Sequence, residues 1–476
     1  MNEKEKELES LIALYNDKKA TDSPTEYHET VPCPPIPAEF ESPMAYLRHL
    51  AHEGILQRYG SSPSAAAIER MNRELDLIEK KGWQDYFLFI WDLIKTAQDT
   101  IPSFLVSAGQ GNASNYMITY LLNITQANPF DFHLPVIFFW REEARFPNFT
   151  LHIDHASYHA FIHMMKQKYG KRVAPILTRN EYHKGQVSNI NVSNYSWAIA
   201  NKNIDSIMPM IEIYDFRNKE NVMCPVYDCW RISEHGAKHL SISGRHHQAI
   251  SVFQKVLAEL KIFYADKQKF LNAIPLNDPE TLQSFRLLEK KEVSEIFWAW
   301  NVDRELLTDF PIDSFQDLVA YDTLIFLDFT PERSLAHEYM RRKTEGVIPP
   351  YMIPDMATVL DETYGLLMYA EQIVLLVNTI SNMDIIEAAS MLEAIQRKKT
   401  DTLREYYYPL FLEGGTRNGY TQQPLEDLFN MLCSTRFRMK SHFLNHALLH
   451  YWAAYLRVHY PEAWQKAHQK EEQPTK

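Results

Sequence analysis

The chain has 476 residues, with 61 acidic side chains against 49 lysines and arginines, and hence a formal net charge of −12. Hydrophobic residues make up 45% of it, which is enough to bury cores and too many for a disordered chain. No run approaches the length of a membrane span, and the N-terminus MNEKEKELES lacks the apolar segment of a secretory signal. Four cysteines are too few for a disulfide scaffold, so a reduced, cytoplasmic location is expected.

Glycine is scarce: the chain has 14, or about 3% against a usual share of about 7%. Loops that cradle phosphate groups need glycine, because only glycine adopts a positive φ without steric cost. Few such loops are therefore expected. The acidic balance argues against nonspecific nucleic-acid binding over the whole surface, but it leaves room for a local basic channel.

The N-terminal part is predicted to be helical after a charged tail. Residues 1–40 indicate a charged helix and then a proline-rich linker. Apolar residues recur every three to four positions in 43–59, 64–81 and 84–98, a pattern typical of amphipathic helices. Gly82 is typical of a helix end between the last two.

A short strand at 104–106, a glycine turn and a helix at 116–122 are predicted next, the layout of an anion-binding loop. Further strands are expected at 134–140 and 149–153, followed by a helix at 156–169.

The remaining chain divides into a polar segment and a helical half. Residues 183–222 are rich in asparagine and weakly periodic, and no element is assigned to them. Helical periodicity then recurs at 246–264, 279–289, 315–320, 330–343, 356–381, 384–397, 401–413, 424–433 and 442–459. The sequence therefore predicts the α+β class, with a mixed N-terminal half and a helical C-terminal half.

Five segments carry a family resemblance. They read YLRHLAHEGILQRYG, ELDLIEKKGWQDYFLFIWDLIKTA, VSAGQGNASNYMITYLLNIT, DETYGLLMYAEQIVLLV and KSHFLNHALLHYWAAYLRVHYPEAW. In this order, over about 43–175 and 225–465, they resemble the bacterial DNA polymerase III α subunits, the C-family polymerases. The resemblance implies a nucleotidyltransferase-type palm, a thumb inserted in it and a large helical fingers domain.

The resemblance also implies domain boundaries. The first palm part, a reduced thumb, the last palm part and the fingers are expected at 41–182, 183–224, 225–262 and 263–464, with a tail and linker at 1–40 and a tail at 465–476. Because the chain starts just before the palm and stops where the fingers end, it is expected to lack the PHP domain and the clamp-binding, helix-hairpin-helix, OB and τ-binding regions of the family.

Nucleotidyl transfer needs two divalent metal ions, and Mg²⁺ prefers carboxylate oxygens. The family supplies three aspartates, two from a PDIDIDF motif and one from KFDFLG. In ungapped register these positions fall on Asn148, Thr150 and Ser241, so every anionic ligand is replaced by a neutral residue. No catalytic residue is then intact and no cofactor is expected; Mg²⁺ is needed only if this register is wrong.

Remnants of nucleotide or phosphate binding are expected in three places. Gly109 and Gly111 persist in the triphosphate loop, although Gln110 replaces its arginine. The other remnants lie in two segments that face nucleotide or nucleic acid in the family, at Arg397, Lys398 and Lys399, and at Lys440, Ser441 and His442.

A dense run of possible metal ligands follows the strand expected at 149–153. It contains His152, Asp154, His155 and His159, with His163 one turn further along. Histidines four residues apart share one helical face and can bind Zn²⁺. The same spacing is typical of a solvated helix face, which is the simpler interpretation.

Three functional hypotheses remain. The first is a noncatalytic pseudo-polymerase that takes part in DNA replication or repair by binding DNA or protein. The second is an active DNA-directed DNA polymerase with relocated metal ligands, for which Asp154 is the nearest remaining carboxylate. The third is a protein-only scaffold. The candidate partners are primer–template or single-stranded DNA and replication or repair proteins, and no membrane is involved.

Overall fold

The computed structural model describes residues 29–109, 114–135, 149–182, 186–215, 218–227, 232–243, 247–297, 304–327 and 334–468. Helices of the N-terminal half surround a small sheet. They are α2 (Pro43–Tyr59), α3 (Ala65–Lys81), α4 (Gln84–Thr100), α5 (Met117–Leu121), α6 (His155–Tyr169) and α7 (Ile204–Ile207). The α+β class predicted from the sequence is confirmed.

The predicted amphipathic helices α2 to α4 are confirmed, and their ends follow from local chemistry. The side chains of Ser42 and Ser64 accept backbone hydrogen bonds at the first turns of α2 and α3. Gly82 ends α3 in the left-handed conformation, with φ of 68°. Where α2 crosses α5, Gly54 is required, because a Cβ atom there would lie 2.5 Å from the carbonyl oxygen of Leu121.

Four strands form the main sheet, in the order β1-β6-β3-β2. They are β1 (Thr150–His152), β2 (Val173–Tyr182), β3 (Gln186–Ile199) and β6 (Lys238–Ser243). β1 and β6 are parallel, whereas β6 pairs antiparallel with β3, and β3 with β2. A hairpin of β4 (Met210–Asp215) and β5 (Glu220–Pro225) packs beside β2 and β3.

Two expectations about strands need correction. Residues 183–222 contain β3, β4 and β5, because nonlocal pairing stabilises strands that are too polar to show a clear period. The strand predicted at 104–106 is wrong: Val106 makes only an isolated bridge with Ile153, since no longer partner runs beside it. Most of the strand predicted at 134–140 lies outside the described residues.

One face of the sheet is apolar and is covered by helices. Leu151, Trp197, Leu240 and Ile242 from the strands join one hydrophobic cluster with Phe161 of α6. Consecutive strand residues point to opposite faces, so Thr150, Ser196 and Ser241 lie on the other face.

The C-terminal half is helical, as predicted. Its helices are α8 (His247–Glu259), α9 (Ala265–Asn272), α10 (Pro279–Ser284), α11 (Lys290–Ile296), α12 (Arg304–Asp309), α13 (Phe315–Leu327), α14 (Ser334–Glu345), α15 (Ala357–Leu360), α16 (Ala370–Ser381), α17 (Ile385–Gln396), α18 (Thr400–Thr402), α19 (Tyr408–Arg417), α20 (Gln422–Ser434), α21 (Lys440–His459) and α22 (Pro461–His468). The helix predicted at 356–381 is interrupted, because Tyr364 and Gly365 adopt positive φ.

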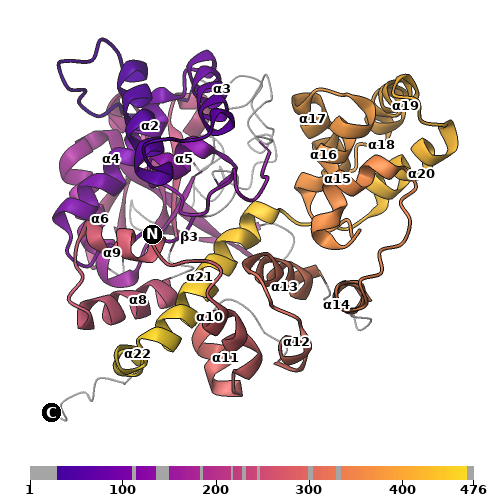
Figure 1. The fold of residues 1–476 in the computed structure, drawn as a ribbon. Helices are drawn as coiled ribbons and strands as arrows, with labels where there is room; N and C mark the ends of the chain where they lie inside the picture. Colours follow the sequence, from indigo (N-terminus) through magenta and orange to yellow (C-terminus); the bar gives the residue numbers. More distant parts are fainter. Residues whose placement is uncertain are drawn as a thin grey trace.

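Helix α21 connects the two halves of the molecule. Figure 1 shows it running between the N-terminal lobe and the separate group formed by α15 to α20. It is buried along most of its length, with both apolar and polar side chains enclosed, as its central position requires. No helix of the described ranges is long and apolar enough to cross a membrane.

Candidate functional site

Two of the three positions assigned to the metal ligands meet on the face of the sheet opposite to the cluster that contains Leu151 and Trp197. Thr150 on β1 is the direct Cα partner of Ser241 on the parallel strand β6. Ser241 is in turn the partner of Ser196 on β3. Three half-buried hydroxyl side chains therefore form a row across three adjacent strands, which we call the hydroxyl row. Asn148 lies outside the described residues.

The hydroxyl row has no anionic neighbour in the strand register. The other paired positions of β1, β6 and β3 on this face hold His152, Ser243, His239 and Ala198. Burial, together with the charge of Lys238, lowers the pKa of His239 to about 4, so the imidazole is neutral at pH 7. The paired positions that the structure describes on this face thus offer hydroxyls and imidazoles to a cation, and no carboxylate.

Asp154, the nearest carboxylate along the chain, has a structural role. It caps α6, where its Oδ1 accepts a hydrogen bond of 2.8 Å from the Ser157 backbone N–H. Its Oδ2 accepts a hydrogen bond of 2.7 Å from Gln254 on α8. Asp154 is fully buried, and both its oxygens are used to join α6 and α8.

The other candidate metal ligands are not gathered into a site. His152 is buried on β1, and the side chain of His155 is outside what the structure describes. His159 and His163 are exposed on α6 and line a cavity on the apolar side of the sheet. Among the described residues, no group of three histidine, cysteine, aspartate or glutamate side chains is placed to hold a metal ion.

The described residues on either side of the glycine loop are tied to their surroundings. Gly109 has φ of 123°, and a Cβ atom there would lie 2.8 Å from Thr125, so packing alone requires glycine. Gly111 lies outside the described residues. Just after the loop, Asn445 of α21 donates a 2.6 Å hydrogen bond to the Ser114 hydroxyl. Arg70 of α3 donates one of 2.8 Å to the Asn115 carbonyl.

The cation expected at the start of α21 is used inside the protein. The Lys440 ammonium lies 2.7 Å from a Glu362 carboxylate oxygen and 3.1 Å from the Phe132 carbonyl. Only 4% of Lys440 is exposed. Ser441 is buried, and His442 contacts His446 edge to face, with ring centroids 4.7 Å apart.

Glu371 on α16 explains why α21 begins where it does. Its carboxylate accepts hydrogen bonds of 2.7 and 3.1 Å from the backbone N–H groups of Lys440 and Ser441. Burial raises the pKa of Glu371, and these N–H groups oppose the rise. Sequence reasoning missed this role, although Glu371 lies in one of the family motifs; only its distance to α21 in space reveals it.

The basic run after α17 remains open to solvent. Arg397 forms an ion pair with Glu393 on the preceding turn, at 2.8 Å. Lys398 and Lys399 are exposed and make no ion pair with a described residue. Of the cationic remnants expected from the sequence, these two lysines are the ones available to a phosphate group.

Comparisons with known proteins match two parts of this chain to domains of one bacterial protein. A family profile described as the bacterial DNA polymerase III alpha NTPase domain matches residues 45–225, and one described as the finger domain of that subunit matches 249–419. A DNA polymerase III subunit alpha of Halalkalibacterium halodurans is 25% identical over 96% of this chain and 46% of its own length. Those of Borreliella burgdorferi and Aquifex aeolicus are 26% and 24% identical, over 96% and 87% of this chain and 44% and 43% of their own lengths. The chain thus spans just under half the length of these relatives.

Proposed function

Because the chain belongs to the family of bacterial DNA polymerase III α subunits, we propose that it is a noncatalytic pseudo-polymerase of this family. In this proposal the sheet of β1, β2, β3 and β6 is a nucleotidyltransferase-type palm. Strand β3 lies within the range 183–224 expected for the reduced thumb, but it pairs with β2 and β6, so the proposed thumb is the β4–β5 hairpin. The helices from 263 to 464 are the fingers. The observation that carries the proposal is the hydroxyl row, Thr150, Ser241 and Ser196 in direct register.

A neutral row cannot replace three carboxylates. Two Mg²⁺ ions must lose part of their hydration shell to enter such a site, and anionic oxygens offset that loss. Without the ions, neither the attacking hydroxyl nor the leaving pyrophosphate is stabilised. The nearest carboxylate, Asp154, already accepts two hydrogen bonds, so it does not supply the missing charge.

The remaining role is binding. We place it in DNA replication or repair, through contact with primer–template or single-stranded DNA or with a protein of the same pathway. The exposed Lys398 and Lys399 support contact with phosphate, because lysine neutralises a phosphate without a metal. The cytoplasmic location remains a prediction.

Primer extension tests the catalytic part of the proposal. The wild-type protein is expected to extend no primer with Mg²⁺ or Mn²⁺. Extension that is lost in Asp154→Asn would contradict the proposal and support an active polymerase with relocated ligands. Because Asp154 is a helix cap, the variant needs a melting curve beside it, and Ser42→Ala, which removes a cap far from the row, is the matched control.

A DNA-binding measurement tests the proposed binding role. Labelled primer–template is titrated at several salt concentrations, and log K is expected to fall linearly with log salt. Lys399→Ala should reduce that slope by up to about 1, the effect of one lost phosphate contact. Lys202→Ala, an exposed lysine on the other lobe, is the matched control. No binding at all, or a slope near zero, would leave only the protein scaffold.

A further inference from the structure

A cavity of about 340 Å³ lies between α6 and the β4–β5 hairpin, and we call it the α6–hairpin pocket. Trp197 forms part of its floor, on the face of the sheet opposite to Ser196 and the hydroxyl row. The other buried lining residues are Ile162, Pro175, Val192, Ser193 and Asp215. The pocket is therefore separate from the site considered above, and its volume is within the range of small-molecule sites.

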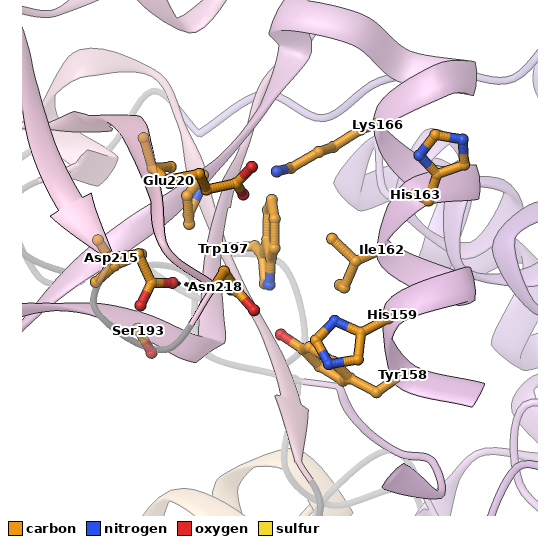
Figure 2. A pocket seen from close by; sticks show the side chains of 13 residues that line it. Tyr158, His159, Ile162, His163, Lys166, Ser193, Trp197, Asp215, Asn218 and Glu220 are labelled. Atoms are coloured by element: carbon orange, nitrogen blue, oxygen red, sulfur yellow. Dashed lines mark hydrogen bonds between the residues drawn. The ribbon is translucent and has the colours of Figure 1, made fainter. Parts of the chain in front are cut away.

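The two walls of the α6–hairpin pocket carry opposite charges. Helix α6 contributes Lys166 and His163, whereas the hairpin contributes Asp215 and Glu220 (Figure 2). No ion pair between described residues joins Lys166 to either carboxylate, although all three line one cavity. The Lys166 ammonium instead lies 5.6 Å from the centroid of the Trp197 ring. Cationic and anionic side chains thus lie on opposite walls of one cavity.

Of the two carboxylates, Asp215 on the floor of the pocket is better placed to bind a cationic group than the exposed Glu220. Asp215 is only 4% exposed, and it accepts a 2.9 Å hydrogen bond from the side-chain amide of Asn218. Glu220 is exposed on the same wall. A buried carboxylate in this cavity is a favourable partner for a positively charged nitrogen, because a hydrogen bond between two charged groups is stronger than one between neutral groups.

The indole N–H group of Trp197 is a second, independent observation that points to a ligand in this pocket. The residue is 3% exposed, and its indole nitrogen has no hydrogen-bond partner among the described residues. Figure 2 shows this nitrogen directed into the space bounded by Tyr158, His159 and Asn218. An unpaired buried N–H group is unfavourable and rare in folded proteins, so the Trp197 indole is a suitable hydrogen-bond donor to a ligand in this pocket.

We propose that the α6–hairpin pocket binds a small zwitterion of amino-acid size. The ammonium group of the ligand lies against Asp215 and Glu220, and its carboxylate contacts Lys166 and accepts the hydrogen bond of the Trp197 indole N–H. The apolar part packs on Ile162 and Val192. A lone anion would face Asp215, and a lone cation would face Lys166, so neither satisfies both walls.

The proposal for this pocket does not depend on the pseudo-polymerase assignment. It has a separate consequence for the stability of the protein. The ligand joins α6 to the β4–β5 hairpin, two elements that the pocket otherwise separates. A ligand that binds only the folded protein stabilises it in proportion to its concentration. Ligand binding is therefore expected to raise the melting temperature of the whole chain, with the largest gain in amide-exchange protection in the hairpin.

Three probes with one ring test the proposal in the full chain: phenylalanine, phenethylamine and 3-phenylpropanoate. Isothermal titration calorimetry should give the tightest binding for phenylalanine, by about tenfold over both others, because each of these lacks one charged contact. Equal binding of all three probes, or no binding of phenylalanine at millimolar concentration, would overturn the proposal.

Variants of the two walls sharpen the test. Lys166→Met should weaken phenylalanine and 3-phenylpropanoate by about three- to fivefold and leave phenethylamine unchanged or tighter. Glu220→Gln should weaken phenylalanine and phenethylamine instead. Lys202→Met and Glu280→Gln, exposed residues away from the pocket, are the matched controls. The same loss for every probe in both wall variants would contradict the assigned orientation.

Trp197→Phe separates the hydrogen bond from the packing. It keeps an aromatic floor and removes the indole N–H group, so phenylalanine should bind about tenfold more weakly. The unliganded variant should lose little stability, because the deleted N–H group is unpaired. Unchanged affinity for phenylalanine would show that the indole nitrogen is not a ligand contact and would refute this part.

Discussion

Two regions of the molecule preserve the family motifs to different degrees. Around the start of α21, Glu371 and Lys440 persist, and each makes buried contacts. Glu371 joins α16 to α21, and Lys440 joins α21 to Glu362 and to the Phe132 carbonyl of the N-terminal half. On the sheet, Thr150 and Ser241 of the hydroxyl row lie at positions that the family resemblance assigns to metal ligands, and no carboxylate is paired with them in the described strand register. The motif residues that remain are those that the folded state needs.

Gly54 and Gly109 are also motif residues that the folded state needs. Both lie in family motifs, and a Cβ atom at either position would collide with neighbouring atoms. The scarcity of glycine is therefore selective, since these two glycines are retained where packing requires them. The largest stability effects are expected at such positions and the smallest in the hydroxyl row.

Gly54→Ala should have the largest effect. The new methyl group would lie 2.5 Å from the Leu121 carbonyl oxygen, so α2 and α5 must move apart. Overpacking of this kind costs about 3 kcal/mol of unfolding free energy, measured by urea denaturation. Gly60→Ala, where nothing lies within 4 Å of the added atom, is the control for the glycine backbone. A smaller loss at Gly54 than at Gly60 would contradict the packing argument.

Glu371→Gln should follow, with a loss of about 2 kcal/mol. The two backbone N–H groups of α21 bond to different oxygens of the carboxylate. The amide is nearly the same size but keeps only one of these acceptors, so its NH2 group faces the other N–H donor. Amide exchange at Lys440 and Ser441 should accelerate in parallel. Unchanged exchange there would mean that Glu371 is not the cap of α21.

Lowering the pH should reduce the stability of the folded protein through His239 on the sheet. The folded pKa of His239 is about 4, below its ordinary value of 6.5, so the unfolded chain binds more protons between these values and stability falls with falling pH. The loss from this one group amounts to about 1 kcal/mol between pH 6.5 and pH 5.5. His239→Leu should remove that component of the pH profile. A profile with the same steepness in the variant would show that His239 titrates normally in the folded state.

Ser241→Ala should have the smallest effect, within about 0.5 kcal/mol of the wild-type stability. Its hydroxyl is half-buried in a row without a charged partner, so little is lost when it is removed. A loss as large as that of Glu371→Gln would mean that the hydroxyl row is a structural feature, and the comparison between the two regions would fail.

Local patterns predicted the helices well, because their signals are short-range. The apolar period of 64–81 and the glycine after it predicted α3, and the structure places Ser64 and Gly82 at its two ends. The strands β3, β4 and β5 escaped prediction, since their stability comes from partners distant in the sequence.

The site was predictable only in part. The family resemblance assigns Thr150 and Ser241 to one site, and the structure makes them direct partners on adjacent strands. Ser196 could not be predicted, because β3 was not recognised. The ion pair of Lys440 with Glu362 was equally inaccessible, since the two residues are 78 positions apart and no periodic pattern connects them.

Metal binding by the sheet face is the most direct test of the account. Mn²⁺ binding would be followed by electron paramagnetic resonance for the wild type and for the variant Asn148→Asp, Thr150→Asp, Ser241→Asp. Ser243→Asp, one residue pair along the same face, is the control for added charge. The account predicts no specific Mn²⁺ binding by the wild type or the control, and binding once the three carboxylates are restored. Stoichiometric, tight Mn²⁺ binding by the wild type that survives in Ser243→Asp and competes with Mg²⁺ would contradict it.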